Sequence, residues 1–313
     1  MRPVIILLLA GVAFAAEPGY ELSGRVVPEC EAAVSLHGAT SPFSASTQSD
    51  TRGRFRFRGL LAGTYTVAVL VPERGETRRT VEVGPGVAGR GGRVEVRIEI
   101  SDAAIETEDL PRRRTVVSAR ELSISDRARH EYQEAQKCLS RRDTAAAIKH
   151  LERAVDISPQ FSAAWNNLGT IAYQSRRFAD AETYFRRALE QDGRAFEPLV
   201  NLGGVLLTLN KLDEALEYNL AAVLSRPNDA LANSQLGMTY FAVDNLTLAQ
   251  KYLEIAKRLD PAHFSHPQLT LAAIHVRRHE EAAAADELED FLRRHPDSPQ
   301  ASELRAAIAK MRK

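Results

Sequence analysis

Five of the eight histidines in this chain fall in one window near its C-terminal end, and imidazole nitrogens are common metal ligands. The five are His263, His266, His275, His279 and His295. His275 and His279 are four residues apart, a spacing that puts two side chains on one face of a helix. No carboxylate or cysteine completes a ligand set in register with them. We therefore predict no metal site and assign these histidines to packing or to the surface.

The sequence signatures of catalysis are absent from the chain. It contains no His-Glu-x-x-His, no Gly-x-Ser-x-Gly, no phosphate-binding glycine loop and no Cys-x-x-Cys. We therefore predict that the protein has no catalytic residues and no cofactor, and that it is not an enzyme.

A row of amide side chains offers binding chemistry instead. Four primary amides recur at intervals of 34 residues: Gln133, Asn167, Asn201 and Gln235. A primary amide both donates and accepts hydrogen bonds, so such a row could pair with the backbone of an extended peptide whatever its side chains. An apolar series accompanies the amides: Leu139, Tyr173, Leu207, Phe241 and Val276. We predict that the four amides, with Tyr173, Leu207 and Phe241, contact a partner.

The small residues of the C-terminal half follow the same interval. Four registers repeat every 34 residues: Ala135, Gly169, Gly203, Gly237; Ala147, Ala181, Ala215, Ala249; Ala154, Ala188, Ala222, Ala256; and the turn residues Pro159, Gly193, Pro227, Pro261. Small side chains let two helices approach closely, and a proline ends a helix and begins a turn. The interval therefore predicts a stack of helix pairs.

This pattern resembles the tetratricopeptide repeat, most clearly in Trp165-Asn-Asn-Leu168-Gly169 with the later Tyr173, Ala181, Phe185 and Ala188. We predict five repeats and a capping helix, at 128–161, 162–195, 196–229, 230–264, 265–297 and 298–313. The resemblance implies an all-α superhelix whose first helices line a concave, partner-binding face. The last helix supplies the polar outer surface that the end of such a stack needs.

Internal roles compete with partner binding for the same residues. An amide at this position of the repeat also packs and caps within such arrays, and an apolar stripe at helical spacing is often inter-helix core. Some members of the family clamp a C-terminal carboxylate with basic residues, where this chain has Tyr132, Glu197 and Asn201. We therefore expect no carboxylate clamp, and both roles of the amides stay open.

The first hundred residues show period-two alternation and turns rich in glycine and proline. The alternating segments are 20–27, 54–58, 64–71, 77–83 and 93–100, which predict a sandwich of short strands. The stretch Asp50-Thr-Arg-Gly53-Arg-Phe55-Arg-Phe57 is similar to carboxypeptidase regulatory-like domains, which are transthyretin-like β-sandwiches. The resemblance implies an antiparallel sandwich over 17–100 that acts as a spacer or docking module. The predicted fold class is thus an all-β antiparallel sandwich followed by an all-α superhelix.

The N-terminal segment predicts export. Arg2 precedes an apolar run, and Ala13-Phe14-Ala15 supplies the small residues that signal peptidase recognises. We predict a signal peptide at 1–16 and a periplasmic or secreted protein of a bacterial envelope. An uncleaved anchor is the alternative, although the run is short for a membrane span. Residues 101–125, with Pro111 and three arginines, are the predicted linker between the domains.

Charge and cysteine content narrow the partners further. Acidic and basic residues number 41 each, so we expect no nucleic-acid partner, which would favour a basic excess. No segment after the first is apolar enough to span a membrane. Cys30 and Cys138 could form a disulfide in an oxidising compartment, but they fall in different predicted domains, and a free, packed thiol is the favoured interpretation of Cys138.

These observations predict an exported scaffold that binds a protein or peptide in the concave groove of its helical array. The alternative is a carbohydrate-binding role for the N-terminal sandwich, with the array recruiting another protein. Sugar sites on sandwiches use exposed aromatic rings, and the aromatic residues here are only Tyr20, Phe43, Phe55, Phe57 and Tyr65. We expect three of these five in the core, which leaves few for glycan contact.

Overall fold

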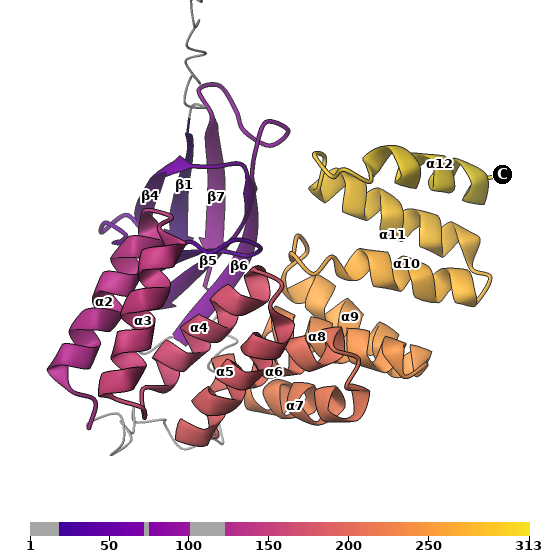
Figure 1. Cartoon of the computed structure of the whole chain (residues 1–313). Coiled ribbons are helices and arrows are strands. Elements are labelled where there is room, and N and C mark those ends of the chain that lie inside the picture. The colour runs from indigo at the N-terminus through magenta and orange to yellow at the C-terminus, as the bar shows by residue number, and fades with distance from the viewer. Residues whose placement is uncertain (1–18, 72–74, 101–122) are drawn as a thin grey trace, which may run out of the picture.

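The computed structural model describes residues 19–71, 75–100 and 123–313, which form a β-sandwich and a helical array (Figure 1). The predicted signal peptide at 1–16 and most of the predicted linker at 101–125 lie outside the described residues. Within those residues, no helix combines the length and the apolar character that a membrane span requires.

Seven strands are described in the sandwich: β1 (Tyr20–Val27), β2 (Ala33–Gly38), β3 (Ser44–Gln48), β4 (Arg54–Leu60), β5 (Gly63–Val71), β6 (Gly75–Val83) and β7 (Arg93–Glu99). They form two sheets with the orders β4-β1-β7 and β3-β2-β5-β6. The alternation in the sequence separates core from solvent: Phe55 and Phe57 on β4 are buried between the sheets, whereas the arginines beside them are exposed.

One pair of strands differs from the expected antiparallel arrangement. β1 and β7 run parallel, with Leu22 beside Val94 and Val26 beside Ile98, while the other ladders are antiparallel. A period-two pattern tells which face a side chain takes but carries no information about strand direction. The alternation therefore could not reveal this parallel pair.

Helices α2 to α12 form the array, in successive pairs and a final single helix. They are α2 (Asp126–Ser140), α3 (Thr144–Ile157), α4 (Ser162–Gln174), α5 (Phe178–Gln191), α6 (Phe196–Thr208), α7 (Leu212–Ser225), α8 (Ala230–Ala242), α9 (Leu246–Leu259), α10 (Pro267–Arg277), α11 (Glu281–Arg294) and α12 (Ala301–Met311). The predicted fold class, a β-sandwich followed by an all-α superhelix, is confirmed.

Small residues let the paired helices pack closely. At Gly169 on α4, an added Cβ would lie 2.5 Å from the ring of Phe185 on α5, and at Gly237 it would lie 2.7 Å from Leu253. The alanines of the other small-residue registers on α3, α5, α7 and α9 are completely buried. The 34-residue interval thus marks the positions where one helix rests against the next.

The turn inside each helix pair also repeats. Its recurring feature is a residue with positive φ just after the first helix, namely Arg142, Arg176, Asn210, Asp244 and His279. A left-handed residue at this position ends a helix and redirects the chain. Four N-terminal ends are capped by side chains, those of Ser125, Asp143, Asp229 and Asn245.

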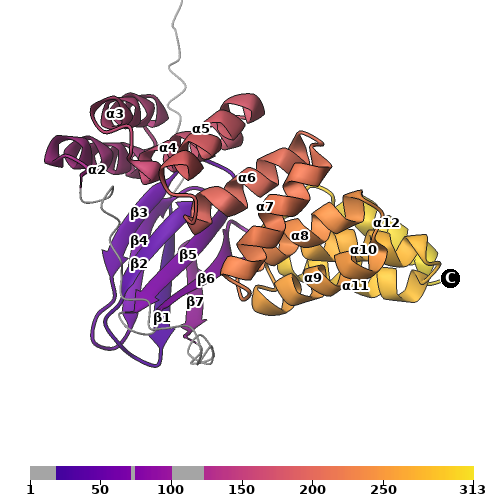
Figure 2. The same cartoon turned by 90° about the horizontal axis from the view of Figure 1, so that it is seen from below.

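The array curves around the sandwich (Figures 1 and 2). β3 lies close to α2, and β6 lies along the turns that join the later repeats. The two domains are therefore packed together, a point that the sequence left open.

Candidate functional site

Two of the four predicted amides bond to the preceding repeat. Asn167 donates from Nδ2 to the hydroxyl of Tyr132 at 3.2 Å, and Asn201 donates from Nδ2 to Oδ1 of Asn166 at 3.0 Å. Both contacts join one first helix to its neighbour, α2 to α4 and α4 to α6. These two amides hold the repeats in register, and any contact with a partner stays a prediction for them.

The other two amides have different surroundings. Gln133 on α2 is exposed. Gln235 on α8 is half-buried, and its Oε1 is buried without a hydrogen-bond partner. Its amide nitrogen rests on Gly204 of the preceding repeat, where an added Cβ would lie 2.4 Å away. The Oε1 of Gln235 is therefore enclosed by the protein and is not available to a ligand in this conformation.

The apolar series is partly core and partly surface. Leu139 is buried, Leu207 and Phe241 are half-buried, and Tyr173 and Val276 are 39% and 46% exposed. The guanidinium of Arg277 lies over the Phe241 ring, 4.4 Å from its centroid. Tyr173 is therefore the predicted aromatic contact with the most accessible side chain.

A feature that sequence reasoning missed is the contact between β6 and the array. Arg78 on β6 donates to Glu197 on α6 at 2.9 Å and lies 4.0 Å from Asp229, the cap of α8. Burial alone would raise the pKa of Glu197, but Arg226 and Arg78 hold it below its usual range. The same acids, with Glu76, keep the pKa of Arg78 raised despite its burial. This cluster fastens the sandwich to the middle of the array.

The array also forms hydrogen bonds with the free edge of β6. The backbone N–H of Thr80 donates to Oδ2 of Asp260 at 2.9 Å, and Arg79 donates to the carbonyl of Leu259. Asp260 is 4% exposed, and burial raises its pKa. Beyond the strand, Gly86 donates its backbone N–H to Asp297 at 2.7 Å. An edge strand normally leaves such N–H groups to water, so these contacts seal the edge.

Two of the clustered histidines meet the sandwich at the same boundary. His295 after α11 is 1% exposed and bonds through Nδ1 to the carboxylate of Glu82 on β6. The rings of His266 and His295 lie 4.5 Å apart. Burial, reinforced by His295, lowers the pKa of His266 to about 4, and burial lowers the pKa of His263 to about 3. His295 and His266 therefore belong to the contact between domains, whereas His263 bonds to Ser265.

The histidines do not assemble a metal centre in the described part of the chain. No group of three or more His, Cys, Asp or Glu side chains there could hold a metal ion. His275 bonds to Glu280 at 2.6 Å, and His279 occupies the positive-φ turn position. Cys30 and Cys138 are both free, half-buried thiols.

A cavity of about 360 Å³ lies where the sandwich faces the array. Its lining residues are Ala39, Thr40, Tyr173, Gln174, Arg176, Phe178, Leu231, Gln235, Met238, Phe264 and Ser265. Two predicted contact residues, Tyr173 and Gln235, therefore meet in one cavity. Gln174 donates from Nε2 to the carbonyl of Gly38 at 3.0 Å and so holds the β2–β3 turn against α4.

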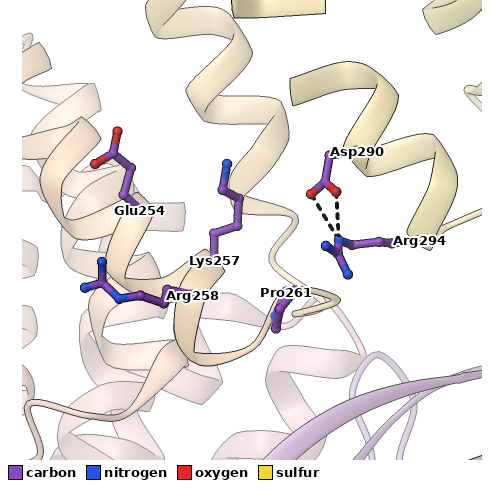
Figure 3. Close-up of a pocket in the computed structure, with 6 residues that line it drawn as sticks. All are labelled: Glu254, Lys257, Arg258, Pro261, Asp290 and Arg294. Atoms are coloured by element: carbon purple, nitrogen blue, oxygen red, sulfur yellow. Dashed lines mark hydrogen bonds and ion pairs between the residues drawn. The ribbon is translucent and has the colours of Figure 1, made fainter. Parts of the chain in front are cut away.

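A second pocket, of about 450 Å³, opens between α9 and α11 (Figure 3). Its walls are Glu254, Lys257, Arg258, Pro261, Asp290 and Arg294. The Nε of Arg294 donates to both carboxylate oxygens of Asp290, at 3.1 and 3.0 Å, and these bonds help to hold the pKa of Asp290 well below its usual range. Its charged groups mainly compensate one another, so the pocket shows no bias toward a charged ligand.

The chain matches two protein families. Residues 132–198 and 167–230 match the tetratricopeptide repeat, and residues 21–97 match the carboxypeptidase regulatory-like domain. The second match spans the sandwich from β1 to β7, and the first runs from within α2 to the start of α8.

Curated relatives and solved structures support the helical array. The chain is 29% identical over 119 residues to the human cell division cycle protein 16 homolog, covering 35% of this chain and 19% of that protein. It is 26% identical over 161 residues to anaphase-promoting complex subunit 3 of Schizosaccharomyces pombe, covering 51% and 24%. The matched part is therefore a quarter or less of these relatives' length.

Two solved structures share the fold of the array. The type IV pilus biogenesis factor PilW superimposes with a TM-score of 0.53 at 23% identity, covering 60% of this chain and 86% of that one. The hetero-tetramer Cut9-Hcn1 of the anaphase-promoting complex gives 0.52 at 18% identity, covering 59% and 36%. Repeats of this kind form interaction scaffolds that are generally not catalytic. The chain is a tetratricopeptide-repeat protein with an N-terminal carboxypeptidase regulatory-like domain.

Proposed function

We propose that this protein is an exported scaffold that binds a protein or peptide partner on the concave side of its repeats, beside the docked sandwich. The observation that carries the proposal is the cavity that joins Tyr173, Gln235 and the β2–β3 turn. Tyr173 offers an exposed ring, and the side chain of Gln235 lines the same cavity. An exposed aromatic ring beside a cavity is a feature that a bound chain would cover.

The four amides do not all have the same role in this proposal. Asn167 and Asn201 are engaged between repeats, so their removal would disturb the array as well as a groove. Gln235 has no such bond from its oxygen. Contact with a partner is therefore expected to centre on the second to fourth repeats, with Gln235 in place of a continuous ladder.

A pair of exposed apolar side chains on opposite sides of the array tests the proposal. Tyr173 lines the cavity, whereas Leu224 lies on α7, a second helix of a pair, and is 73% exposed. The full chain, Tyr173→Ser and Leu224→Ser are immobilised and exposed to a bacterial envelope extract, and the affinity of each captured protein is then measured in purified form. We expect the partner to be lost from Tyr173→Ser and kept by Leu224→Ser. Equal retention, or loss only from Leu224→Ser, would move the binding surface away from the concave side.

Export is proposed from the N-terminal segment alone. Expression of the full chain in a bacterial host should place it in the periplasm or medium, with a mature N-terminus at Glu17. A full-length protein that keeps residues 1–16 and stays with the membrane would favour the uncleaved anchor.

No observation favours the glycan alternative. Phe55, Phe57 and Tyr65 are buried, and Tyr20 and Phe43 are half-buried against the same core. Phe43 also packs edge-on to Tyr65 at 5.6 Å and carries Arg142 at 4.5 Å. The described sandwich therefore presents no exposed row of rings for a sugar.

A further inference from the structure

The cavity between the domains combines two chemical features, an apolar lining and one cationic side chain. Its walls are largely apolar, with Tyr173, Leu231, Met238 and Phe264 contributing side chains. These residues come from α4, from α8 and from the loop before α10, so they line the side of the array that faces the sandwich. An apolar enclosure of this kind favours an aromatic or large aliphatic group from a ligand.

One charged group on the lining has no ion-pair partner. Arg176, at the positive-φ turn after α4, is exposed, and no acidic side chain of the described residues pairs with it. The Oε1 of Gln235 also accepts no hydrogen bond, but it is enclosed by the protein and has no surface that a ligand could reach. A cation at the side of an apolar cavity calls for a ligand that carries a carboxylate.

The volume limits how much of a ligand can enter. The cavity measures about 360 Å³, near the lower end of the range of roughly 300–1,000 Å³ that small-molecule sites occupy. That space suits one large side chain and the backbone beside it. Ala39 and Thr40 of the sandwich form one wall, so a ligand there contacts both domains.

We infer that the cavity binds an aromatic residue of a partner segment with an acidic residue next to it. The ring packs among Tyr173, Met238 and Phe264, and the carboxylate lies toward Arg176. This inference rests on the proposed function and specifies its ligand. It also makes the sandwich a part of the binding site, because its β2–β3 turn closes the cavity.

The methionines provide a direct readout. The chain has three: Met1 lies outside the described residues, Met238 lines the cavity, and Met311 packs at the end of α12. The probe is the synthetic peptide acetyl-Gly-Ser-Phe-Asp-Ser-Gly-amide, titrated into full chain labelled with ¹³C at the methionine methyls. We expect a saturable shift of the Met238 methyl resonance and none for Met311. Replacing Phe by Ala in the probe should weaken binding at least about tenfold, because the buried ring supplies most of the contact area.

One variant tests the polar contact, and a second is its control. Arg176→Asn removes the charge with a residue that tolerates positive φ, and we expect about threefold weaker binding, the size of an exposed ion pair. Arg258→Gln, which removes an exposed arginine in the α9–α11 pocket, should leave binding unchanged.

The outcomes separate this inference from the proposed function. An unmoved Met238 methyl at millimolar probe, or equal shifts with the Phe and Ala probes, overturns the assignment of the cavity. If a partner captured by the full chain is lost with Tyr173→Ser yet also leaves the Met238 methyl unmoved, the concave side binds it elsewhere and only the cavity assignment fails. If the partner is kept by Tyr173→Ser, the proposed function fails by its own test, whatever the probe peptide does.

Discussion

Single polar side chains determine how the sandwich sits on the array. Arg78, Thr80 and Glu82 occupy alternate positions on β6, and their partners are Glu197, Asp260 and His295. In the sequence these residues look like the solvent-facing half of an alternating strand and like ordinary turn residues. The partners are separated by 119 to 213 residues, and no local pattern connects them.

The Arg78 cluster should contribute measurably to stability. Arg78→Ala removes the cation that joins the domains and leaves Arg226 to compensate both Glu197 and Asp229. We expect the free energy of unfolding to fall by about 2 kcal/mol, since two partly buried carboxylates then share one cation. Chemical denaturation measures it. Arg97→Ala, which removes an exposed pair with Glu99, is the control and should change stability by less than about 0.5 kcal/mol; a similar loss in both variants would contradict the expectation.

His266 should make stability depend on pH. Its pKa is lowered from 6.5 to about 4 in the folded protein, where His263, His295 and Glu82 are its titratable neighbours. Between these pH values the imidazole of His266 binds a proton in the unfolded chain but not in the folded one. The free energy of unfolding therefore falls as the pH drops from about 6.5 to 4. A shift of this size corresponds to roughly 3 kcal/mol.

The comparison of the full chain with His266→Asn isolates this effect. Asparagine tolerates the positive φ of position 266 and does not titrate. Melting temperatures measured from pH 7.5 to 4 should decline more steeply for the full chain than for the variant. Parallel curves would show that His266 does not carry the acid sensitivity.

At the scale of the elements, the small residues inside the repeats are the strongest constraint. Gly169→Ala would press a Cβ to within 2.5 Å of the Phe185 ring, so α4 and α5 must separate or the ring must move. We expect a loss of about 1–3 kcal/mol in the free energy of unfolding. Gly193→Ala is the matched control, because its Cβ would meet nothing closer than 3.6 Å and its φ is not positive. It should be neutral or slightly stabilising, and a loss as large as that of Gly169→Ala would contradict this account.

Sequence patterns predicted most elements because each reflects a local repeat. The five alternating segments became β1, β4, β5, β6 and β7, and the 34-residue interval became the stacked helix pairs. β3 (Ser44–Gln48) was not predicted, because its small residues show little difference in hydrophobicity between the two faces of the strand. The left-handed turn residues were not predicted either, because arginine, which occupies positions 142 and 176, is not a residue type that usually indicates positive φ.

The candidate site could be predicted only in part. Spacing placed Tyr173 and Gln235 on first helices, but it could not tell that Asn167 and Asn201 would bond to neighbouring repeats. Nor could it show that Ala39 and Thr40 would close a cavity around Tyr173. These contacts depend on helix rotation and on domain docking, which sequence spacing does not specify.

At the scale of the whole molecule, the two domains should behave as one body in solution. Arg78→Ala combined with Glu82→Ala removes two of the contacts along β6. We expect the radius of gyration from small-angle scattering to increase, because both ion pairs of β6 with the array are then lost and the hydrogen bonds of Arg79, Thr80 and Gly86 have to hold this side alone. Glu95→Ala with Arg97→Ala, on β7 of the other sheet, is the control. Unchanged scattering in both double variants would mean that β6 does not hold the domains together.

The line of contacts along β6 also limits how this array could lengthen or shorten over evolution. Solenoids commonly gain or lose whole units, because each unit contacts only its neighbours. Here one strand meets the start of the third unit, the turn before the fifth and the end of the fifth in fixed order. Deleting or duplicating the third or fourth unit would keep the helices stacked but would bring the wrong turns opposite Thr80 and Glu82. The docked sandwich therefore constrains the number of units from the third to the fifth. A change in that number requires a change in how the sandwich docks.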